Sequence, residues 1–143
     1  MQLVHGTTVA IEGRGVLIRG GSGSGKSDLA LRLIDGGAVL VSDDQTALAA
    51  SDDRLIASAP AAIAGLLEVR GLGLVRLPYL ASSPLTLVVD LVAADGVERL
   101  PEENRTEFLG LELPLIRFAA FEVSTAAKVR LAAICPTRDI IRS

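Results

Sequence analysis

Short apolar segments separated by turns rich in glycine and aspartate run through the first third of the chain. Residues 7–20, TTVAIEGRGVLIRG, hold two such segments on either side of Glu12-Gly13, which predicts a β-hairpin. In residues 26–35, KSDLALRLID, the apolar positions instead recur at helical spacing, and glycines follow. This pattern predicts a helix that ends at the glycines, because glycine accepts the left-handed conformation common at helix ends.

A buried strand is expected directly after these glycines. Residues 38–41, AVLV, are wholly apolar, and Ser42-Asp43-Asp44 stands at the carboxyl end of this segment. The second half of the chain is predicted to consist mostly of strands, within TALAAS (46–51), RLIAS (54–58), LLEVRGLGLVRL (66–77) and LTLVVDLV (85–92).

The C-terminal region is predicted to mix strand and helix. GLELPLIRFAAF, residues 110–121, predicts one strand, or two strands broken at Pro114. STAAKVRLAAI, residues 124–134, has helical character, with Ser124 or Thr125 as the N-cap.

The remaining segment, AADGVERLPEENR (93–105), predicts a polar surface loop. Strands and helices alternate without a linker, so the sequence predicts one α/β domain over residues 1–143, with a mixed sheet and no additional N-terminal domain. Hydrophobic residues make up 50% of the chain but aromatic residues only 3%, so the core is expected to consist of leucine, valine, isoleucine and alanine. Apolar residues of the second half fit an interface as well as a core, which leaves a homo-oligomer open.

Charge and composition narrow the classes of function. The net charge of −3 gives no electrostatic reason to expect binding to nucleic acid or to an anionic membrane. No apolar run approaches the roughly 18 residues of a membrane span, and the N-terminus lacks the pattern of a secretion signal. Cys135 is the only cysteine, which excludes an internal disulfide and fits the cytoplasm, and a zinc site is not expected.

Residues 20–27, GGSGSGKS, match the phosphate-binding motif G-x-x-x-x-G-K-[ST] between a predicted strand and a predicted helix. The chain uses arginine almost throughout, and its lysines are Lys26 and Lys128. The alternative is a flexible Gly/Ser turn that precedes a lysine by chance. The motif and its context favour a P-loop that holds phosphates with Gly20, Gly21, Ser22, Gly23, Ser24, Gly25, Lys26 and Ser27.

The chemistry of this loop suits a nucleotide and its metal. Glycines allow successive backbone N–H groups to point at phosphate oxygens, and the following helix presents the positive end of its dipole. Lys26 would neutralise charge on the terminal phosphates, and the Ser27 hydroxyl is a hard oxygen suited to Mg²⁺. The loop is therefore expected to bind phosphates together with Mg²⁺.

An aspartate pair ends the strand that follows the predicted P-loop helix. Ligands of open α/β sheets bind beyond the carboxyl ends of strands, so Asp43 and Asp44 are candidates to face the γ-phosphate and its metal. By position alone, an exposed turn after a strand explains the pair equally well. Adjacent side chains of a strand point to opposite sides, so only one of them is expected to serve the chemistry directly. Asp90 is a second candidate, but the apolar residues after it favour a position within a strand, on a solvated face of the sheet.

Several of these motifs together resemble one family. Residues 5–44, HGTTVAIEGRGVLIRGGSGSGKSDLALRLIDGGAVLVSDD, and residues 67–77, LEVRGLGLVRL, resemble the catalytic domain of HPr kinase/phosphorylase, in the short form found in some proteobacteria. The resemblance implies ATP- and Mg²⁺-dependent phosphorylation of a serine on HPr, the phosphocarrier protein of the bacterial sugar phosphotransferase system. It also implies a nucleotide-binding fold similar to that of phosphoenolpyruvate carboxykinase.

The resemblance also implies residue roles. Asp43 matches the general base toward the HPr serine, and His5 matches a histidine near that aspartate. Asp44 would support the metal or the polar network, and Glu68 would help to hold the metal together with Ser27. From spacing alone His5 would be a surface or structural residue, and Glu68 would lie on the polar face of an amphipathic strand.

The chain departs from the family near its C-terminus. A Pro-Gly-Arg-Asn segment is expected there, and this sequence does not contain it. Arg117 or Arg130 is a candidate to replace its arginine, and spacing does not choose between them. This departure leaves open the reverse reaction, phosphorolysis of the phosphoserine. It also leaves two other functions open: a nucleotide-binding regulator with little transfer activity, and a P-loop kinase for a small metabolite.

Overall fold

The hairpin predicted at Glu12-Gly13 forms the middle of the sheet. In the computed structural model, which describes residues 1–135 and 140–141, β2 (Thr7–Ile11) and β3 (Arg14–Arg19) pair antiparallel around this turn. Glu12 has φ 49° and Gly13 has φ 78°. Positive φ at both central residues gives the turn a twist that matches the strands, so the pair closes with a tight connection.

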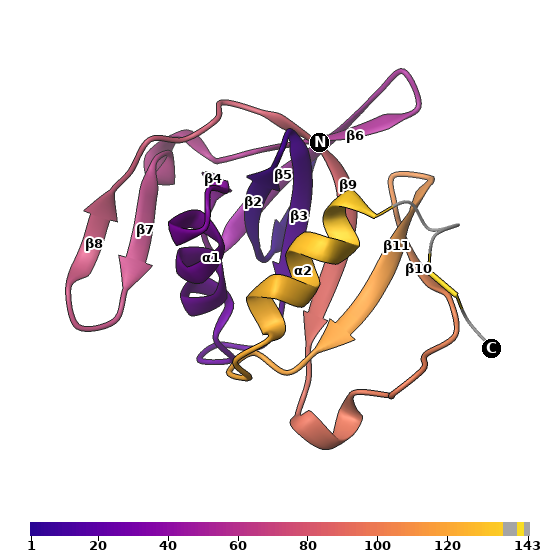
Figure 1. Ribbon diagram of the computed structural model, residues 1–143. Coiled ribbons are helices and arrows are strands. Elements are labelled where there is room, and N and C mark those ends of the chain that lie inside the picture. The colour runs from indigo at the N-terminus through magenta and orange to yellow at the C-terminus, as the bar shows by residue number, and fades with distance from the viewer. Residues whose placement is uncertain (136–139, 142–143) are drawn as a thin grey trace.

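The other strands of the main sheet extend on both sides of this hairpin (Figure 1). The strand order is β1-β5-β6-β9-β3-β2-β4, and β11 pairs with both β9 and β10. The pairs β3–β9 and β9–β11 are parallel and the others are antiparallel, so the predicted mixed α/β sheet is confirmed. The strands are β1 (Gln2–His5), β4 (Val39–Ser42), β5 (Gln45–Ser51), β6 (Arg54–Ser58), β9 (Ser83–Leu91), β10 (Asn104–Phe108) and β11 (Leu111–Phe118).

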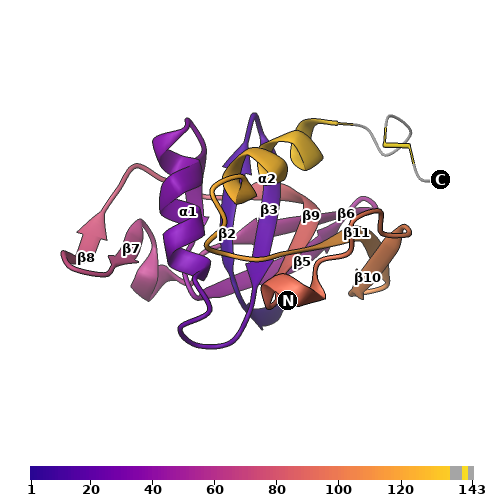
Figure 2. The ribbon, with the colours of Figure 1, turned by 60° about the horizontal axis from the view of Figure 1, so that its bottom comes forward.

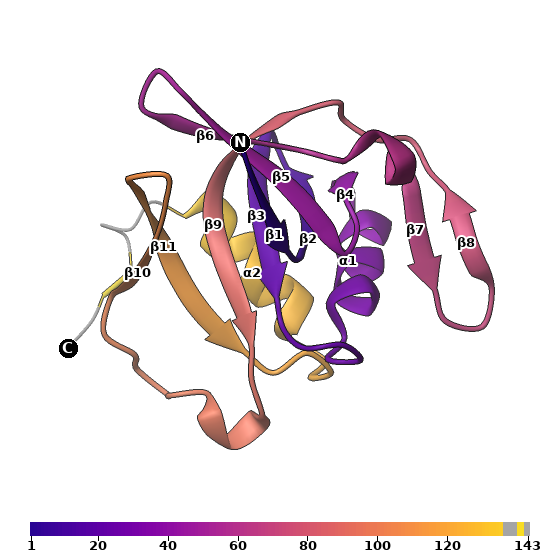
Figure 3. The same ribbon diagram turned by 180° about the vertical axis from the view of Figure 1, so that it is seen from behind.

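Apolar side chains fill both faces of the central strands. Val16 and Ile18 of β3 pack toward the helices, and Leu17 between them packs into a second cluster on the opposite face. Strands that are buried on both faces are continuous apolar runs. The helices α1 (Lys26–Asp35) and α2 (Thr125–Ile134) lie together on one face, as Figures 2 and 3 show from two directions.

Both predicted helices are present with nearly the predicted bounds. Leu29 and Leu33 of α1 are fully buried, and the helix ends at the predicted glycines, with Gly37 at φ 111°. Ser124 is the N-cap residue of α2 but makes no side-chain capping bond. Thr125 instead donates its hydroxyl to the carbonyl of Ala119. In the described part of the chain, neither helix combines the length and apolar character that crossing a membrane requires.

The segment at 66–77 forms a hairpin outside the main sheet. β7 (Leu66–Val69) and β8 (Gly73–Arg76) pair only with each other, and Figure 1 shows them beside α1. Gly71 has φ 92° and lies in the turn between them, and Gly73, with φ 107°, is the first residue of β8. Short 3₁₀ turns at Ala61–Ile63 and Ala94–Gly96 complete the described secondary structure.

The margins of the sheet agree with the sequence prediction only in part. β11 continues through Pro114, so the single strand is confirmed and the break is absent. Pairing of β11 with β9 begins only at Leu115, so Pro114 has a paired strand, β10, on one side only. Proline is tolerated where a strand lacks a partner on one side. β1 and β10 were not predicted, and β10 begins inside the predicted polar loop. Both strands are mainly exposed, so neither has the apolar pattern of a core strand.

Candidate active site

The glycine loop of residues 20–27 connects the carboxyl end of β3 to the first turn of α1. Gly25 is the N-cap residue at φ 102°, and no side chain caps the first turn. A Cβ at Gly25 would lie 2.8 Å from Ala120 Cβ and 2.8 Å from Phe121 Cζ, so glycine is required here by space as well as by conformation. The N–H groups at the start of α1 therefore remain available to an anion.

The side chain of Lys26 is buried at the start of α1. The residue is 6% exposed, and its Nζ donates hydrogen bonds to the carbonyls of Gly20 (2.9 Å) and Gly21 (3.0 Å). An ammonium group has three N–H donors, so one donor remains after these contacts. No carboxylate lies within ion-pair distance of Lys26 in the described part of the chain. Its charge is thus held by the loop but not neutralised.

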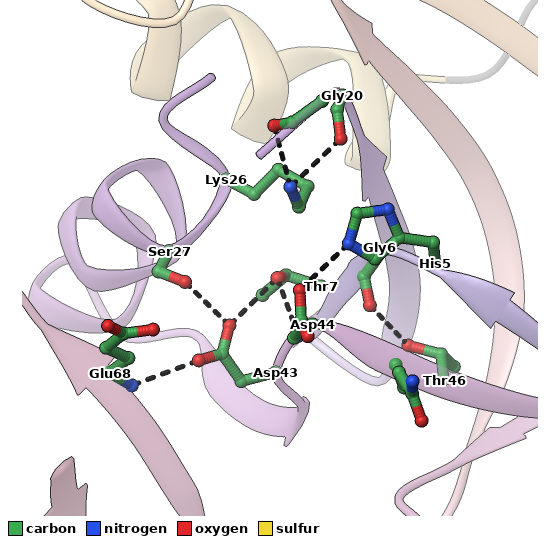
Figure 4. A network of polar contacts seen from close by, with 12 residues as sticks. His5, Gly6, Thr7, Gly20, Lys26, Ser27, Asp43, Asp44, Thr46 and Glu68 are labelled. Carbon is green, nitrogen blue, oxygen red and sulfur yellow. Dashed lines mark hydrogen bonds and ion pairs between the residues drawn. The ribbon is translucent and has the colours of Figure 1, made fainter. Parts of the chain in front are cut away.

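Asp43 stands directly after β4, and its carboxylate is buried among neutral donors (Figure 4). Its Oδ1 accepts hydrogen bonds from Ser27 Oγ (2.7 Å) and Thr7 Oγ1 (2.9 Å). Its Oδ2 accepts the backbone N–H of Glu68 at 3.0 Å. Asp43 is 6% exposed and forms no ion pair within residues 1–135 and 140–141. Segments distant in sequence therefore converge on one buried carboxylate.

Asp44 lies beside Asp43 in sequence but in a different environment. Its φ of 66° turns the chain, and its Oδ1 lies 2.9 Å from His5 Nε2. The side chains of His5 and Asp44 are 54% and 65% exposed. The backbone N–H of Gly6 donates to the carbonyl of Asp44 at 2.8 Å. The structure thus separates the predicted pair into a buried carboxylate and an exposed one, and it places His5 next to the exposed one.

Asp90, the other candidate carboxylate, forms an ion pair with Arg19. Arg19 Nε and Nη2 donate to Asp90 Oδ1 (2.7 Å) and Oδ2 (3.0 Å). Arg19 also lies over the ring of Phe108, which belongs to the apolar cluster on the face opposite the helices. Asp90 is therefore not among the groups that surround Lys26 and Ser27.

The remaining predicted residues lie in different places. Arg130 Nη2 donates to the carbonyl of Arg32 in the last turn of α1, so Arg130 lies at the opposite end of that helix from the glycine loop. Arg117 is exposed on β11 and lines a cavity of about 520 Å³. None of the residues lining that cavity belongs to the glycine loop or the aspartate pair. Glu68 contacts Asp43 through its backbone, and its side chain is exposed.

Sequence analysis missed Thr7 as a site residue. Its hydroxyl contacts Asp43 across 36 positions of the sequence, and it lies within a segment that was read only as a strand. The available signal was a polar residue at the start of a buried strand, directly after the His5-Gly6 pair.

Fold and site together define the class of this protein: an α/β domain with a glycine loop that opens a helix and a buried aspartate facing that helix. Within this class the family is specific. The family model described as HPr Serine kinase C-terminal domain matches residues 1–135, so the chain belongs to this family, as the sequence motifs predicted.

Relatives of known name agree with this assignment. The chain is 41% identical over 123 residues to the HPr kinase/phosphorylase of Geobacillus thermodenitrificans (strain NG80-2), covering 78% of this chain and 40% of the relative. It is 38% identical over 125 residues to that of Listeria welshimeri, covering 79% of this chain and 40% of the relative. The chain thus spans about 40% of the length of these relatives.

A solved structure has a similar fold over nearly the whole chain. The HPr(Ser) kinase/phosphatase from Coxiella burnetii superposes with a TM-score of 0.81 at 27% sequence identity. The match covers 91% of this chain and 92% of that structure.

Proposed function

We propose that this chain is a protein kinase domain that transfers the γ-phosphoryl group of ATP to a serine of HPr or an HPr-like carrier. The observation that carries this proposal is the buried Lys26, whose ammonium group has carbonyl partners but no carboxylate partner in the described chain. A buried charge without an opposite charge nearby costs free energy of folding, and a bound ligand of opposite charge would offset this cost. The phosphates of a nucleotide would supply the missing negative charge.

The glycine loop fits this role as a P-loop. The uncapped first turn of α1 offers N–H donors together with the positive end of the helix dipole. Ser24 adds a further polar group: its hydroxyl is buried and has no hydrogen-bond partner among the described residues. A phosphate oxygen would satisfy these donors together with the third N–H of Lys26. The similarity of the nucleotide-binding fold to that of phosphoenolpyruvate carboxykinase stays a prediction.

The donor set also fits Mg²⁺. Ser27, in the first turn of α1, offers a hard hydroxyl oxygen beside the loop, and the carboxylates of Asp44 and Glu68 offer further hard oxygens. The described residues contain no cluster of three or more histidine, cysteine, aspartate or glutamate side chains suited to a metal. Mg²⁺ is usually held by one or two carboxylates together with substrate phosphates and water, and when bound it neutralises charge on the phosphates. We propose that Ser27 holds the ion with help from Asp44 and Glu68, as the family resemblance implies.

Asp43 is proposed to act as the general base. A serine hydroxyl is a poor nucleophile at neutral pH, so a nearby carboxylate assists by accepting its proton. The serine oxygen then forms a bond to the γ-phosphorus, the bond from that phosphorus to the bridging oxygen breaks, and ADP leaves with those electrons. Lys26 would stabilise the charge on the transferring group. His5 would orient Asp44 through the contact at 2.9 Å.

HPr as partner rests on the family alone. The relatives from Geobacillus and Listeria are named HPr kinase/phosphorylase, and the Coxiella structure is named an HPr(Ser) kinase/phosphatase. The reverse reaction, a cytoplasmic location and self-association belong to the same proposal. A kinase for a small metabolite is less favoured, because the cavity of about 520 Å³ contains no residue of the candidate site.

Transfer to HPr is the decisive experiment. The protein is incubated with HPr from the same organism, Mg²⁺ and ATP labelled at the γ-phosphate, and labelled HPr is analysed for phosphoserine. The expected result is ATP- and Mg²⁺-dependent phosphoserine on HPr, and a second reaction with inorganic phosphate tests its removal. Protein that binds ATP but labels no HPr would contradict the proposal and favour the regulator or the metabolite kinase.

A further inference from the structure

One buried hydroxyl joins the two aspartates. Thr7 Oγ1 donates to Asp43 Oδ1 at 2.9 Å and accepts the backbone N–H of Asp44 at 3.1 Å. Thr7 is 0% exposed, so bulk solvent does not reach these contacts. The hydroxyl uses its single donor on one aspartate and an acceptor site on the other. Figure 4 shows Thr7 between the two residues.

The register of the sheet explains this arrangement. β2 and β4 are antiparallel, with Thr8 opposite Ser42, so the next residues along, Thr7 and Asp43, are brought together. The register shifts between Thr8 and Val9, where β4 has one extra residue, Val41, so an irregularity in the pairing of β2 with β4 lies beside the site. Such irregularities often re-aim a side chain next to an active site.

The backbone of Asp44 depends on the same contact. Its φ of 66° lies in a region that costs a non-glycine residue energy and persists only when the surroundings fix it. The N–H of Asp44 donates to Thr7 Oγ1, and its carbonyl accepts the N–H of Gly6. Its carboxylate forms a hydrogen bond with His5. Without the Thr7 hydroxyl, the amide of Asp44 and the carboxylate of Asp43 would each lose a partner.

Thr8, the neighbour of Thr7, has a buried hydroxyl that does not join the two aspartates. Thr8 is also 0% exposed, but its Oγ1 lies 2.9 Å from Thr46 Oγ1 and makes no contact with either aspartate. The two neighbouring threonines are thus matched in burial and chemistry and differ in what they touch.

We propose that Thr7 is the positioning residue of the aspartate pair, which fixes the Asp43 carboxylate toward Ser27 and the glycine loop while holding the turn at Asp44. This inference rests on the proposed function of Asp43 as the base. Loss of the hydroxyl should misplace a base that is otherwise intact, so turnover should fall while nucleotide binding persists.

The test compares Thr7→Val with Thr7→Ser and Thr8→Val in the full chain. Transfer to HPr is measured for kcat and for the KM of ATP. Thr7→Val should lower kcat by roughly 10–100-fold with the KM of ATP changed less than about threefold, because small misplacements of a catalytic group are costly. Thr7→Ser restores the hydroxyl and should recover kcat, and Thr8→Val should retain kcat although it also loses a buried hydroxyl. Thr7→Ala takes the place of Thr7→Val if the valine variant does not fold.

The inference is overturned if Thr8→Val loses as much kcat as Thr7→Val, if Thr7→Ser fails to recover it, or if Thr7→Val keeps full turnover. A crystal structure of Thr7→Val provides a readout that does not depend on activity. Asp43 should turn away from Ser27 Oγ, whereas an Asp43 that keeps its bonds to Ser27 and to the Glu68 amide contradicts the inference. If the unmutated protein does not phosphorylate HPr, the proposed function fails, and this structure alone decides the role of Thr7.

Discussion

Two cations and two carboxylates lie around the glycine loop. One cation and one carboxylate neutralise each other, and the other two have neutral hydrogen-bond partners in the described part of the chain. Arg19, directly before the loop, forms a two-bond ion pair with Asp90. Lys26, at the end of the loop, and Asp43, directly after β4, have only neutral partners in the described part of the chain. We call the first set the closed pair and the second set the open pair.

If the proposed function is correct, this difference distinguishes charges that stabilise the fold from charges that serve the reaction. In the closed pair each charge is neutralised by the other, and its side chains are 29% and 27% exposed. In the open pair both residues are 6% exposed, yet hydroxyls, amides and carbonyls hold them without neutralising them. Burial of a charge without an opposite charge lowers the stability of the fold, and such charges are typical of sites that bind a charged ligand. Substitutions in the two pairs should therefore have different consequences.

The largest effect is expected at Lys26. Lys26→Ala should abolish transfer and weaken ATP binding by roughly 10–100-fold, because a hydrogen bond to a charged group is worth about 1.5–3 kcal/mol. Lys128→Ala is the matched control, since Lys128 is the other lysine of the chain and is exposed on α2. Calorimetric titration with ATP measures both variants, and equal affinities would contradict the assignment of the open pair.

Asp43→Asn and Asp90→Asn compare the carboxylates directly. Asp43→Asn should leave ATP binding largely intact and lower turnover by roughly 10²–10⁴-fold, the range expected for loss of a general base. Asp90→Asn should keep turnover but reduce the free energy of unfolding by about 1–2 kcal/mol, because Arg19 loses its ion pair. Steady-state transfer and urea unfolding distinguish these outcomes. Near-normal turnover by Asp43→Asn would show that the base is another group.

Asp44→Asn tests whether the exposed aspartate serves the metal. If Asp44 helps to hold Mg²⁺, the variant should need several times more Mg²⁺ for half-maximal transfer, while its kcat at saturating Mg²⁺ stays within roughly tenfold of the original. Titration of the transfer reaction with MgCl₂ measures this requirement. An unchanged Mg²⁺ requirement would remove Asp44 from the metal site.

The smallest effect is expected at Arg130. Arg130→Ala removes the hydrogen bond to the Arg32 carbonyl in the last turn of α1 and should reduce the free energy of unfolding by about 1 kcal/mol. Turnover should not change, because Arg130 lies at the far end of α1 from the loop. A large loss of turnover without loss of stability would make Arg130 the replacement for the family's missing arginine after all.

Much of the fold could be predicted because its signals are local. The hairpin at Glu12-Gly13, the helix with its glycine stop and the glycine loop each depend on a few adjacent residues, and the structure contains all of these elements. The exposed strands β1 and β10 were missed because they pack few apolar side chains. Pro114 was open to either reading because only the neighbouring strands determine whether its missing N–H matters.

The sequence indicated most residues of the candidate site but not how they are arranged in space. Motifs identified the glycine loop, Asp43-Asp44 and His5, yet the sequence could not tell which aspartate is buried. That choice depends on the turn at Asp44 and on the register of β2 against β4, which pairs residues distant in the sequence. Thr7 was missed for the same reason.

The most direct test of the open pair is a crystal structure with Mg²⁺ and a nonhydrolysable ATP analogue. The account predicts that the terminal phosphates lie in the loop of residues 20–27, that Lys26 Nζ donates to them, and that Asp43 faces the γ-phosphate. A nucleotide bound elsewhere, such as in the cavity beside β11 and α2, with Lys26 still bonded only to Gly20 and Gly21, would contradict it.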